Sequence, residues 1–419
     1  MSCCPNNNSL PLHGEFSIDL TKTTIRMKNS SFFVLHSSFT PDLLRWYAEN
    51  RRELPWRDTT DPYLIWLSEV ILQQTRIQQG WAYWERFVER WHTVEELAAA
   101  SEDEVLRLWQ GLGYYSRARN LHAAAKQIVQ MGGFPRTYEG IRSLKGVGDY
   151  TAAAIASFAF GLPHAVVDGN VYRVLARHFG IDTPINTTEG KKLFTALANE
   201  LLPTDQPAAF NQAMMDFGAI QCTPQSPRCV LCPFTTTCDA LRTGRIDLLP
   251  VKEKKLTIKT RHFAYLYIRY NGTTAFHRRS AGDIWQGLWE PLLFESDASA
   301  SATAMLHDFI HRSGVEGKLI LLKSQVKHVL THRILLADFY LWEVPSPPSL
   351  PPTYEWLPES SLDDHAKPRL VEILLETLTG NEKLKSKTPI LRRGQKPRKG
   401  DRPQAGVEAP DDKSKVTES

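Results

Sequence analysis

Residues 222–238 read CTPQSPRCVLCPFTTTC and contain four of the six cysteines of the chain, Cys222, Cys229, Cys232 and Cys238. Their spacing is C-x6-C-x2-C-x5-C. Four thiolates in one short loop can enclose a zinc ion or an iron–sulfur cluster. Such a loop folds around its metal, so metal binding also stabilises the fold. The segment divides the chain, because the sequence before it predicts helices and the sequence after it predicts strands.

The composition is that of a soluble globular protein. A chain of 419 residues with 42% hydrophobic residues is expected to form two or three domains with a sizeable core. The formal net charge is only +4, so any nucleic-acid-binding surface has to be local. No apolar run is long enough to span a bilayer, and the first residues lack a signal pattern. We expect a reducing compartment, where cysteines bind metal and do not form disulfides.

From Thr40 to Ile220 the apolar residues recur with a helical period, which predicts an all-α region. One helix is expected to open at Pro41. The helix at Tyr63–Gln74 is apolar almost all round and is therefore expected to be buried. The other helices are predicted near Trp81–Trp91, Glu102–Trp109, Arg117–Gln130, Tyr150–Phe160, Asn170–Phe179, Glu189–Leu201 and Pro207–Ile220.

The period changes to two after a charged segment, which predicts a second domain of the α+β class. The strands are expected at His262–Arg269, Thr273–Arg278 and Ile334–Val344, with a helix near Ala302–Arg312. The expected organisation is a disordered leader at 1–37, a helical domain at 38–242, a linker at 243–259, an α+β domain at 260–376 and a basic disordered tail at 377–419.

The segment Leu144–Thr151, LKGVGDYT, lies between two predicted helices. Gly146 and Gly148 permit a tight turn with an exposed backbone, and the next helix starts at once. The free N–H groups of such a turn can bind a phosphate oxygen without reading the bases. A plain turn between helices is the alternative, but the cysteine loop downstream favours DNA binding.

Two carboxylates stand out from their surroundings. Glu69 interrupts the apolar segment YLIWLSEVIL (63–72), so its pKa should rise above about 4.3, and a protonated carboxyl can act as a general acid. The alternative is a buried glutamate tied to backbone amides or to an arginine. Asp168 precedes an amphipathic helix and taken alone would be its N-cap. Beside a DNA-binding hairpin, such a pair suits cleavage of a glycosidic bond.

These features agree with a known family. From Thr40 to Leu375 the chain resembles the MutY adenine DNA glycosylases of the helix–hairpin–helix superfamily. The matching motifs are Leu54–Trp56, Trp66–Thr75, Gly111–Arg117, Leu144–Thr151, Val167–Val171, Phe210–Asp216 and the cysteine loop. The resemblance implies an all-α helix–hairpin–helix domain with an iron–sulfur loop, followed by an α+β Nudix-like domain. It implies removal of adenine opposite 8-oxoguanine or guanine in double-stranded DNA, as a step of base excision repair.

The resemblance also assigns roles to residues. Glu69 matches the acid that protonates adenine at N7, and Asp168 the carboxylate that stabilises the oxocarbenium ion, with Asn170 as its partner. Tyr150 matches an active-site position that is a lysine in strand-cleaving relatives. A phenol cannot form a Schiff base, so a monofunctional glycosylase is expected.

Further residues are assigned to DNA and metal. Gln74, Thr75 and Tyr114 match residues that wedge into the duplex, although an ordinary buried aromatic is the alternative for Tyr114. The four cysteines match the ligands of a 4Fe-4S cluster, which is therefore preferred to zinc. The expected protein is a monomer in the cytoplasm, associated with the nucleoid and its mispaired DNA and not with a membrane.

Residues 328–332, HVLTH, align with the family loop that recognises 8-oxoguanine. His328, Thr331 and His332 are the expected contacts, and a structural role in a turn is the alternative for both histidines. Leu-Thr-His replaces the usual Phe-Ser-His, so a hydroxyl is kept and an aromatic ring is lost. No Nudix cluster of glutamates follows Trp289, so this domain is expected to be a sensor. Two alternatives remain, a bifunctional glycosylase–lyase resembling endonuclease III and a noncatalytic damage-binding protein.

Overall fold

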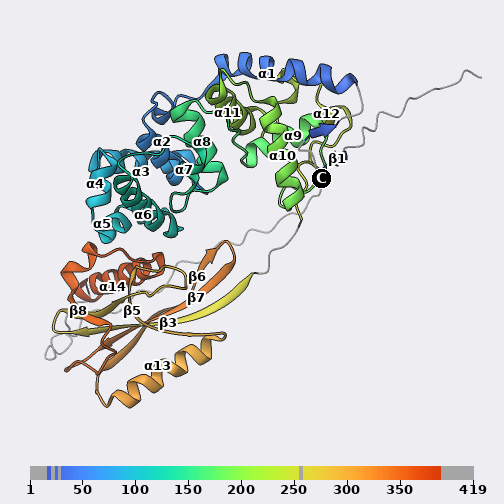
Figure 1. Ribbon diagram of the computed structural model, residues 1–419. Helices are drawn as coiled ribbons and strands as arrows, with labels where there is room; N and C mark the ends of the chain where they lie inside the picture. Colours follow the sequence, from blue (N-terminus) through green and yellow to red (C-terminus); the bar gives the residue numbers. More distant parts are fainter. Residues whose placement is uncertain (1–16, 20–23, 27–29, 254–257, 388–419) are drawn as a thin grey trace, which may run out of the picture. The chain divides into compact units, whose positions relative to one another are not determined.

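The computed structural model describes residues 17–19, 24–26, 30–253 and 258–387, in which a helical region precedes a region built on a six-stranded sheet (Figure 1). Strands β1 (Ser17–Asp19) and β2 (Thr24–Arg26) and the start of α1 (Ser30–Asn50) lie within the segment predicted to be a disordered leader. The rest of that segment lies outside the described residues. The prediction that a helix opens at Pro41 is wrong, because α1 begins earlier and contains this proline.

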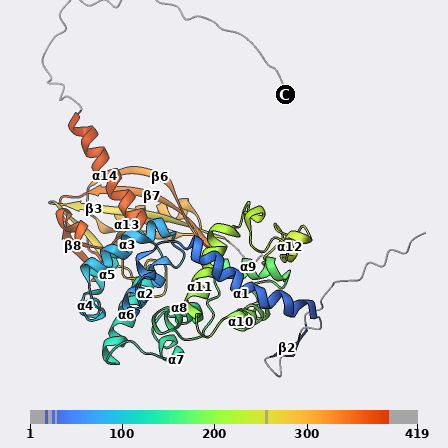
Figure 2. The ribbon, with the colours of Figure 1, turned by 90° about the horizontal axis from the view of Figure 1, so that it is seen from above.

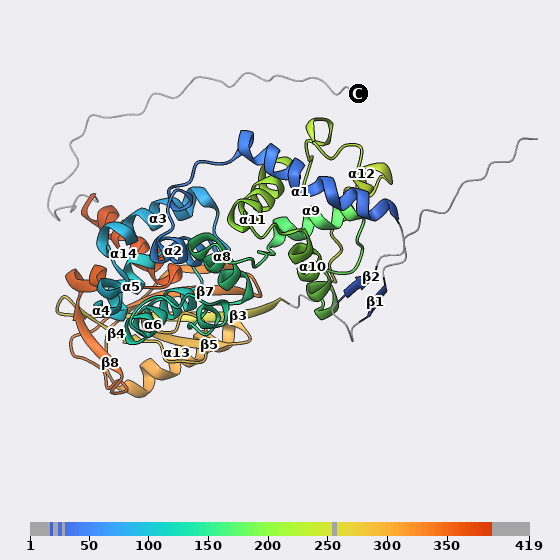
Figure 3. The ribbon, with the colours of Figure 1, turned by 45° about the horizontal axis from the view of Figure 1, so that its top comes forward.

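A first helical cluster runs from η1 to α8. Its core includes Trp66 and Trp109, both fully buried, and α2 packs along α8 (Figure 3). The apolar pattern of α2 is therefore the pattern of a helix enclosed by its neighbours. The elements are η1 (Pro55–Arg57), α2 (Pro62–Leu72), α3 (Ile77–Arg90), α4 (Val94–Ala99), α5 (Glu102–Trp109), α6 (Ser116–Gln130), α7 (Tyr138–Arg142) and α8 (Asp149–Phe160).

A second helical cluster joins α1 to the helices that follow α8. Its core includes Phe39, Phe194 and Phe210. Figure 2 shows α1 lying along α11, and α12 packs against α9. The helix predicted at Pro207–Ile220 is α-helical only to Asp216 and ends in a π-helical turn. The elements are α9 (Gly169–Phe179), α10 (Thr188–Leu201), α11 (Pro207–Asp216), the π-helix Phe217–Gln221, the 3-10 turn Cys229–Leu231 and α12 (Asp239–Arg242).

The second region is a mixed sheet with the strand order β6-β7-β3-β5-β4-β8. The strands are β3 (Lys259–Tyr270), β4 (Thr273–Arg278), β5 (Trp289–Ser296), β6 (Lys318–Leu330), β7 (Arg333–Glu343) and β8 (Tyr354–Pro358). The inner strand β3 is parallel to β7 and antiparallel to β5, and its residues 263–268 are all buried. Strand β6 forms one edge, and its register against β7 shifts between Leu321 and Val326.

Helix α13 (Ser299–Ser313) covers one face of the sheet and packs on β3 and β5 through Ala302 and Leu306 (Figure 1). It contains a single carboxylate, Asp308. After η4 (Glu359–Asp364), helix α14 (Arg369–Lys387) continues past the predicted domain end at 376. Part of the predicted tail is therefore helical, and residues 388–419 lie outside the described part of the chain.

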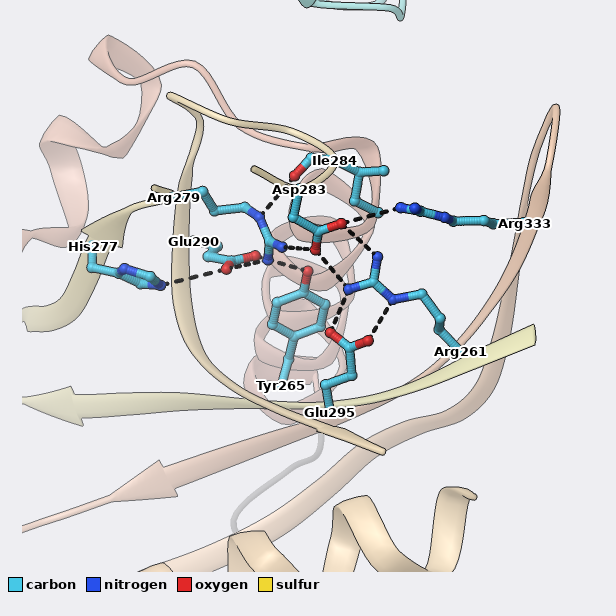
Figure 4. A network of polar contacts seen from close by, with 9 residues as sticks. All are labelled: Arg261, Tyr265, His277, Arg279, Asp283, Ile284, Glu290, Glu295 and Arg333. Atoms are coloured by element: carbon cyan, nitrogen blue, oxygen red, sulfur yellow. Dashed lines mark hydrogen bonds and ion pairs between the residues drawn. The ribbon is translucent and has the colours of Figure 1, made fainter. Parts of the chain in front are cut away.

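An ion-pair network fastens the loop between β4 and β5 to the sheet (Figure 4). Asp283 in this loop accepts hydrogen bonds from Arg261 at 2.6 Å, from Arg279 at 2.8 Å and from Arg333 at 3.1 Å. The hydrogen bonds from Arg261 are the largest cause of the strongly lowered pKa of Asp283. Glu290 is buried and accepts from Arg279 at 2.5 Å and from Tyr265 at 3.1 Å. Both oxygens of Glu290 thus have protein partners.

Candidate active site

A pocket of about 810 Å³ lies where the two helical clusters meet. Glu69 of α2, Tyr150 of α8 and Asp168 at the start of α9 line it, together with Gly146 and Gly148. The two carboxylates singled out in the sequence thus share one pocket. They also influence each other electrostatically, because the charge of Asp168 contributes to raising the pKa of Glu69.

Glu69 has only 6% of its surface exposed, as expected for a residue on an apolar helix. Burial raises its pKa to about 7, although a hydrogen bond from Tyr150 and the charge of Arg57 oppose the shift. The Tyr150 hydroxyl donates to Glu69 Oε2 at 2.8 Å. A carboxyl group with this pKa can hold and release a proton near neutral pH, as a general acid requires.

Arg57, whose positive charge acts to lower the pKa of Glu69, was not predicted from the sequence as part of the site. Arg57 of η1 donates to Asp216 at 2.6 Å, and Arg52 donates to the same carboxylate at 2.7 Å. Asp216 is fully buried, and desolvation acts to raise its pKa. The pKa is nevertheless lowered, because the hydrogen bonds from Arg57 and Arg52 and the charge of Arg57 together outweigh desolvation. Arg57 is therefore neutralised by Asp216, which limits how far it can lower the pKa of Glu69. An aspartate in the apolar segment FNQAMMDFGAI (210–220) was the available signal.

Asp168 is the N-cap of α9 and also lines the pocket. Its Oδ1 accepts from the backbone N–H groups of Asn170 and Val171, both at 2.8 Å, and its Oδ2 accepts from the Asn170 side chain at 2.7 Å. Burial nevertheless raises its pKa. The two interpretations of the sequence are therefore compatible, because one carboxylate caps the helix and faces the cavity.

The partner of Asp168 is itself held in place. Asn170 Oδ1 accepts a hydrogen bond from Arg173 at 2.8 Å. Arg173 also donates to the carbonyl oxygens of Gly218 at 2.6 Å and of Cys222 at 2.8 Å. A continuous series of hydrogen bonds thus connects Asp168 with the backbone of the first cysteine of the loop.

The predicted hairpin consists of α7, a tight turn and α8. Gly146 has φ of +76°, and an added Cβ would lie 2.5 Å from the Cβ of Asn120. Gly148 is the N-cap of α8 and has no side chain to bind the first N–H groups of the helix. Arg142 supports the turn by donating to the Val147 carbonyl at 3.0 Å. The first N–H groups of α8 therefore receive no hydrogen bond from a capping side chain.

The three predicted wedge residues lie on two loops of the first helical cluster. Gln74 and Tyr114 both have left-handed backbones, with φ of 57° and 47°. Gln74 lines the pocket and Thr75 follows it directly. Tyr114 is 48% exposed, so the alternative of a buried aromatic is wrong.

The four cysteines line a common cavity with Arg177, whose side chain is buried and whose Nη1 lies 3.5 Å from Cys222 Sγ. All four are free thiols. Burial raises the pKa of Cys232 to about 12, so a thiolate there needs a cationic partner. Within the described residues, no group of three His, Cys, Asp or Glu side chains could hold a single metal ion.

Comparisons with known proteins agree with this geometry. Residues 67–201 match the family model of the HhH-GPD superfamily base excision DNA repair proteins, and residues 264–377 match that of the NUDIX domain. The adenine DNA glycosylase of Buchnera aphidicola subsp. Baizongia pistaciae is 33% identical over 304 residues, which cover 71% of this chain and 84% of that protein. This chain belongs to the adenine DNA glycosylase family.

Another relative and a solved structure are similar to about half of this chain. The human adenine DNA glycosylase is 44% identical over 215 residues, or 49% of this chain and 39% of the human protein. The structure of a thermostable thymine-DNA glycosylase covers 51% of this chain and 100% of its own, with 31% identity and a TM-score of 0.48.

The pocket around Glu69 also contains residues that the sequence did not single out. The rings of Tyr138 and His164 stack with their centroids 4.4 Å apart, and Tyr172 of α9 lies on the wall. Helix α10 contributes an exposed row with a spacing of four residues. Its members are Lys191, Thr195 and Asn199. The sequence signal that could have identified these residues was the row of polar side chains that recurs every four residues along this helix.

The residues predicted to recognise 8-oxoguanine lie on the β6–β7 hairpin and are not among those that line the pocket around Glu69. His328 is partly buried and its ring centroid lies 5.9 Å from that of Trp285. Burial lowers the pKa of His328, and the charge of Arg369 adds to this. Thr331 and His332 are exposed in the turn.

Among the helices that the structure describes, none combines the length and the apolar character that a membrane-spanning segment needs.

Proposed function

We propose that this protein hydrolyses the N-glycosidic bond of adenine mispaired with 8-oxoguanine or guanine in double-stranded DNA. The observation that carries the proposal is the buried Glu69, which has a pKa of about 7 and lines the same pocket as Asp168. Membership of the adenine DNA glycosylase family supports adenine as the base that is removed. We propose that the reaction is a step of base excision repair. We also propose that it takes place in the cytoplasm, next to the nucleoid.

The chemistry follows from the two carboxyl groups. Glu69 gives its proton to N7 of the extruded adenine, and the bond between N9 and C1′ breaks with its electron pair going to the base. The anionic Asp168 stabilises the cationic sugar, and Asn170 holds this carboxylate in place. A water oxygen then bonds to C1′ and releases a proton. Tyr150 has no amine for a Schiff base, so the proposed enzyme is monofunctional.

The DNA contacts follow from the hairpin and the wedge loops. The N–H groups near Gly146 and Gly148 would bind a backbone phosphate, while Gln74, Thr75 and Tyr114 would fill the space left in the duplex. One chain carries all these residues, so we propose that it acts as a monomer.

We propose that the sheet region reads the base opposite adenine through His328, Thr331 and His332. Both oxygens of Glu290 accept hydrogen bonds, from Arg279 and from Tyr265, which supports a recognition role over Nudix hydrolysis.

The limits of the two domains, residues 38–242 and 260–376, stay predictions.

We also propose that the four cysteines hold a 4Fe-4S cluster. They face one cavity beside a buried arginine, and an anionic cluster would balance that charge. The iron–sulfur cluster would fix the loop between the π-helix Phe217–Gln221 and α12.

The test of the proposed acid is single-turnover release of adenine from a duplex with adenine opposite 8-oxoguanine. Glu69→Gln should lower the rate by about a hundredfold or more, because a positioned general acid contributes about 10²–10⁴-fold. Glu89→Gln, at an exposed position of α3, is the matched control. Full activity of Glu69→Gln would reject the assignment.

Two further measurements define the reaction. Adenine release should be fastest opposite 8-oxoguanine and slower opposite guanine, cytosine and thymine. Borohydride should trap no protein–DNA adduct. A stable adduct would instead support a glycosylase–lyase, and tight binding without base release would support a noncatalytic protein.

A further inference from the structure

Arg117, in the first turn of α6, is buried with 8% of its surface exposed. Among the described residues, no carboxylate lies within ion-pair distance of its guanidinium. Burial lowers the pKa of Arg117 to about 10. A buried cation without a counter-ion is unfavourable unless oxygen atoms surround it. The oxygens that surround Arg117 come from two separate loops.

The first group of oxygens comes from the last turn of α2 and from Gln73, where the loop after α2 begins. Arg117 Nη1 donates to the carbonyl oxygens of Val70 at 3.0 Å and Ile71 at 2.9 Å, and also to that of Gln73. These are carbonyls that the helix leaves unpaired at its C-terminal end. The positive charge also interacts favourably with the negative end of the dipole of α2.

The second loop connects α5 with α6. Arg117 Nη2 donates to the carbonyl oxygens of Gly113 at 3.3 Å and Leu112 at 3.5 Å. The same nitrogen donates to the hydroxyl of Thr75 at 3.3 Å, which ties the two loops together. The guanidinium carbon lies 4.9 Å from the centre of the Trp109 ring and 5.8 Å from that of Tyr114.

These bonds act on the two strained residues of the site. Gln74 and Tyr114 have left-handed backbones, which are unfavourable for residues other than glycine. Arg117 binds the carbonyl of Gln73, which precedes Gln74, and the carbonyl of Gly113, which precedes Tyr114. One side chain therefore fixes the peptide plane in front of each strained residue.

We propose that Arg117 is a positioning residue that keeps Gln74 and Tyr114 jointly in their left-handed conformations, ready to enter the duplex as adenine leaves it. This inference rests on the proposed function, in which these two residues form the wedge. A lysine cannot replace it, because its donors share one nitrogen, whereas the two Nη atoms of Arg117 reach different loops.

The experiment compares two substrates for the full chain, with Arg117→Lys, Tyr114→Ala and the control Arg90→Lys at an exposed position of α3. The first substrate is a duplex with adenine opposite 8-oxoguanine. The second keeps this pair inside a short mismatched bubble, where adenine is already unstacked. We expect Arg117→Lys to slow single-turnover release about tenfold or more on the duplex and less than about threefold on the bubble. The dependence of the rate on pH, which Glu69 determines, should stay that of the wild type.

Hydrogen–deuterium exchange of the free proteins provides a second measurement. Arg117→Lys should raise exchange in residues 73–75 and 111–115 together, and not in α8. Equal loss on both substrates, an altered pH profile, or exchange that rises across the whole helical region would show a general folding defect and overturn the inference.

The failure of the inference and that of the proposed function can be told apart. A wild type that releases no adenine would reject the proposed function. Equal effects of Tyr114→Ala on both substrates would reject the wedge, and the inference with it. A duplex-specific loss in Tyr114→Ala without one in Arg117→Lys would overturn the inference alone.

Discussion

At the scale of single residues, the pKa of Glu69 should determine the pH range of the proposed reaction. In the proposed mechanism the protonated form of Glu69 is the active one, and its fraction is halved near pH 7. We expect single-turnover adenine release to fall as the pH rises through 7, and about tenfold per unit at higher pH. The raised pKa of Asp168 predicts a second loss on the acid side, because this carboxylate must be ionised. A rate that stays constant from pH 6 to pH 9 would contradict the role of Glu69.

The same pKa predicts an effect on stability. A carboxyl whose pKa is raised in the folded state stabilises the fold fully only below its unfolded pKa of about 4.3. This contribution is lost as the pH rises towards the folded value of about 7. Denaturant unfolding of the wild type and Glu69→Gln should therefore show the wild type losing stability relative to the variant between pH 5 and pH 8. A constant difference would show that Glu69 has no raised pKa.

The double role of Asp168 can be separated by two substitutions. Asn is as good an N-cap as Asp, but its NH2 group cannot accept the hydrogen bond from the Asn170 side chain. Asp168→Asn should therefore unfold with about 1 kcal/mol less free energy than the wild type. It should nevertheless lose most adenine release, because the charge opposite the sugar is gone. Asp168→Ala should lose the cap as well and unfold with about 0.5–2 kcal/mol less free energy. Unimpaired adenine release by Asp168→Asn would leave Asp168 with the helix-capping role only.

At the scale of elements, the hairpin offers a matched pair of glycines. Gly146→Ala combines a left-handed φ with a contact to Asn120, and should cost about 1–3 kcal/mol of stability and weaken DNA binding. An alanine at Gly148 meets no atom within 4 Å, so its cost should stay below about 1 kcal/mol. Thermal unfolding and fluorescence anisotropy with duplex DNA measure both effects. Equal costs would mean that the turn geometry is not limiting.

The sequence predicted elements that carry a clear local pattern, and it missed elements without one. The bounds of α5 and β4 agree with the predictions because clear polar or turn residues flank both. Helices α4 and α7 were missed because they are only 6 and 5 residues long, too short for a period to appear. Strand β6 was missed because it is a partly exposed edge with register shifts.

The same distinction holds for the site. Glu69 and Asp168 could be found because each breaks a local pattern. The pair of Arg57 and Asp216 joins residues 159 positions apart, and no local pattern records such a contact. The hydrogen bonds of Arg117 were hidden for the same reason.

At the scale of the whole molecule, the cysteine loop should stabilise one helical cluster more than the other. Removing iron with a chelator under reducing conditions should raise hydrogen exchange in α9 and α12, because Arg173 and Arg177 of α9 bind the carbonyls of Cys222 and Thr223. Helices α2 and α8 should change less. An equal rise in both clusters would contradict this, and protein that contains stoichiometric zinc would overturn the proposed cluster.

The edge strand β6 has a consequence for how the protein behaves in concentrated solution. An open strand edge invites pairing with the edge of another molecule, and lysines and irregular register discourage it. Strand β6 exposes Leu321 and Val329, but Lys323 and Lys327 and its shifted register lie between them. Replacing these two lysines by threonine would remove that protection, and the protein should then aggregate into sheet-rich particles long before its melting temperature is reached.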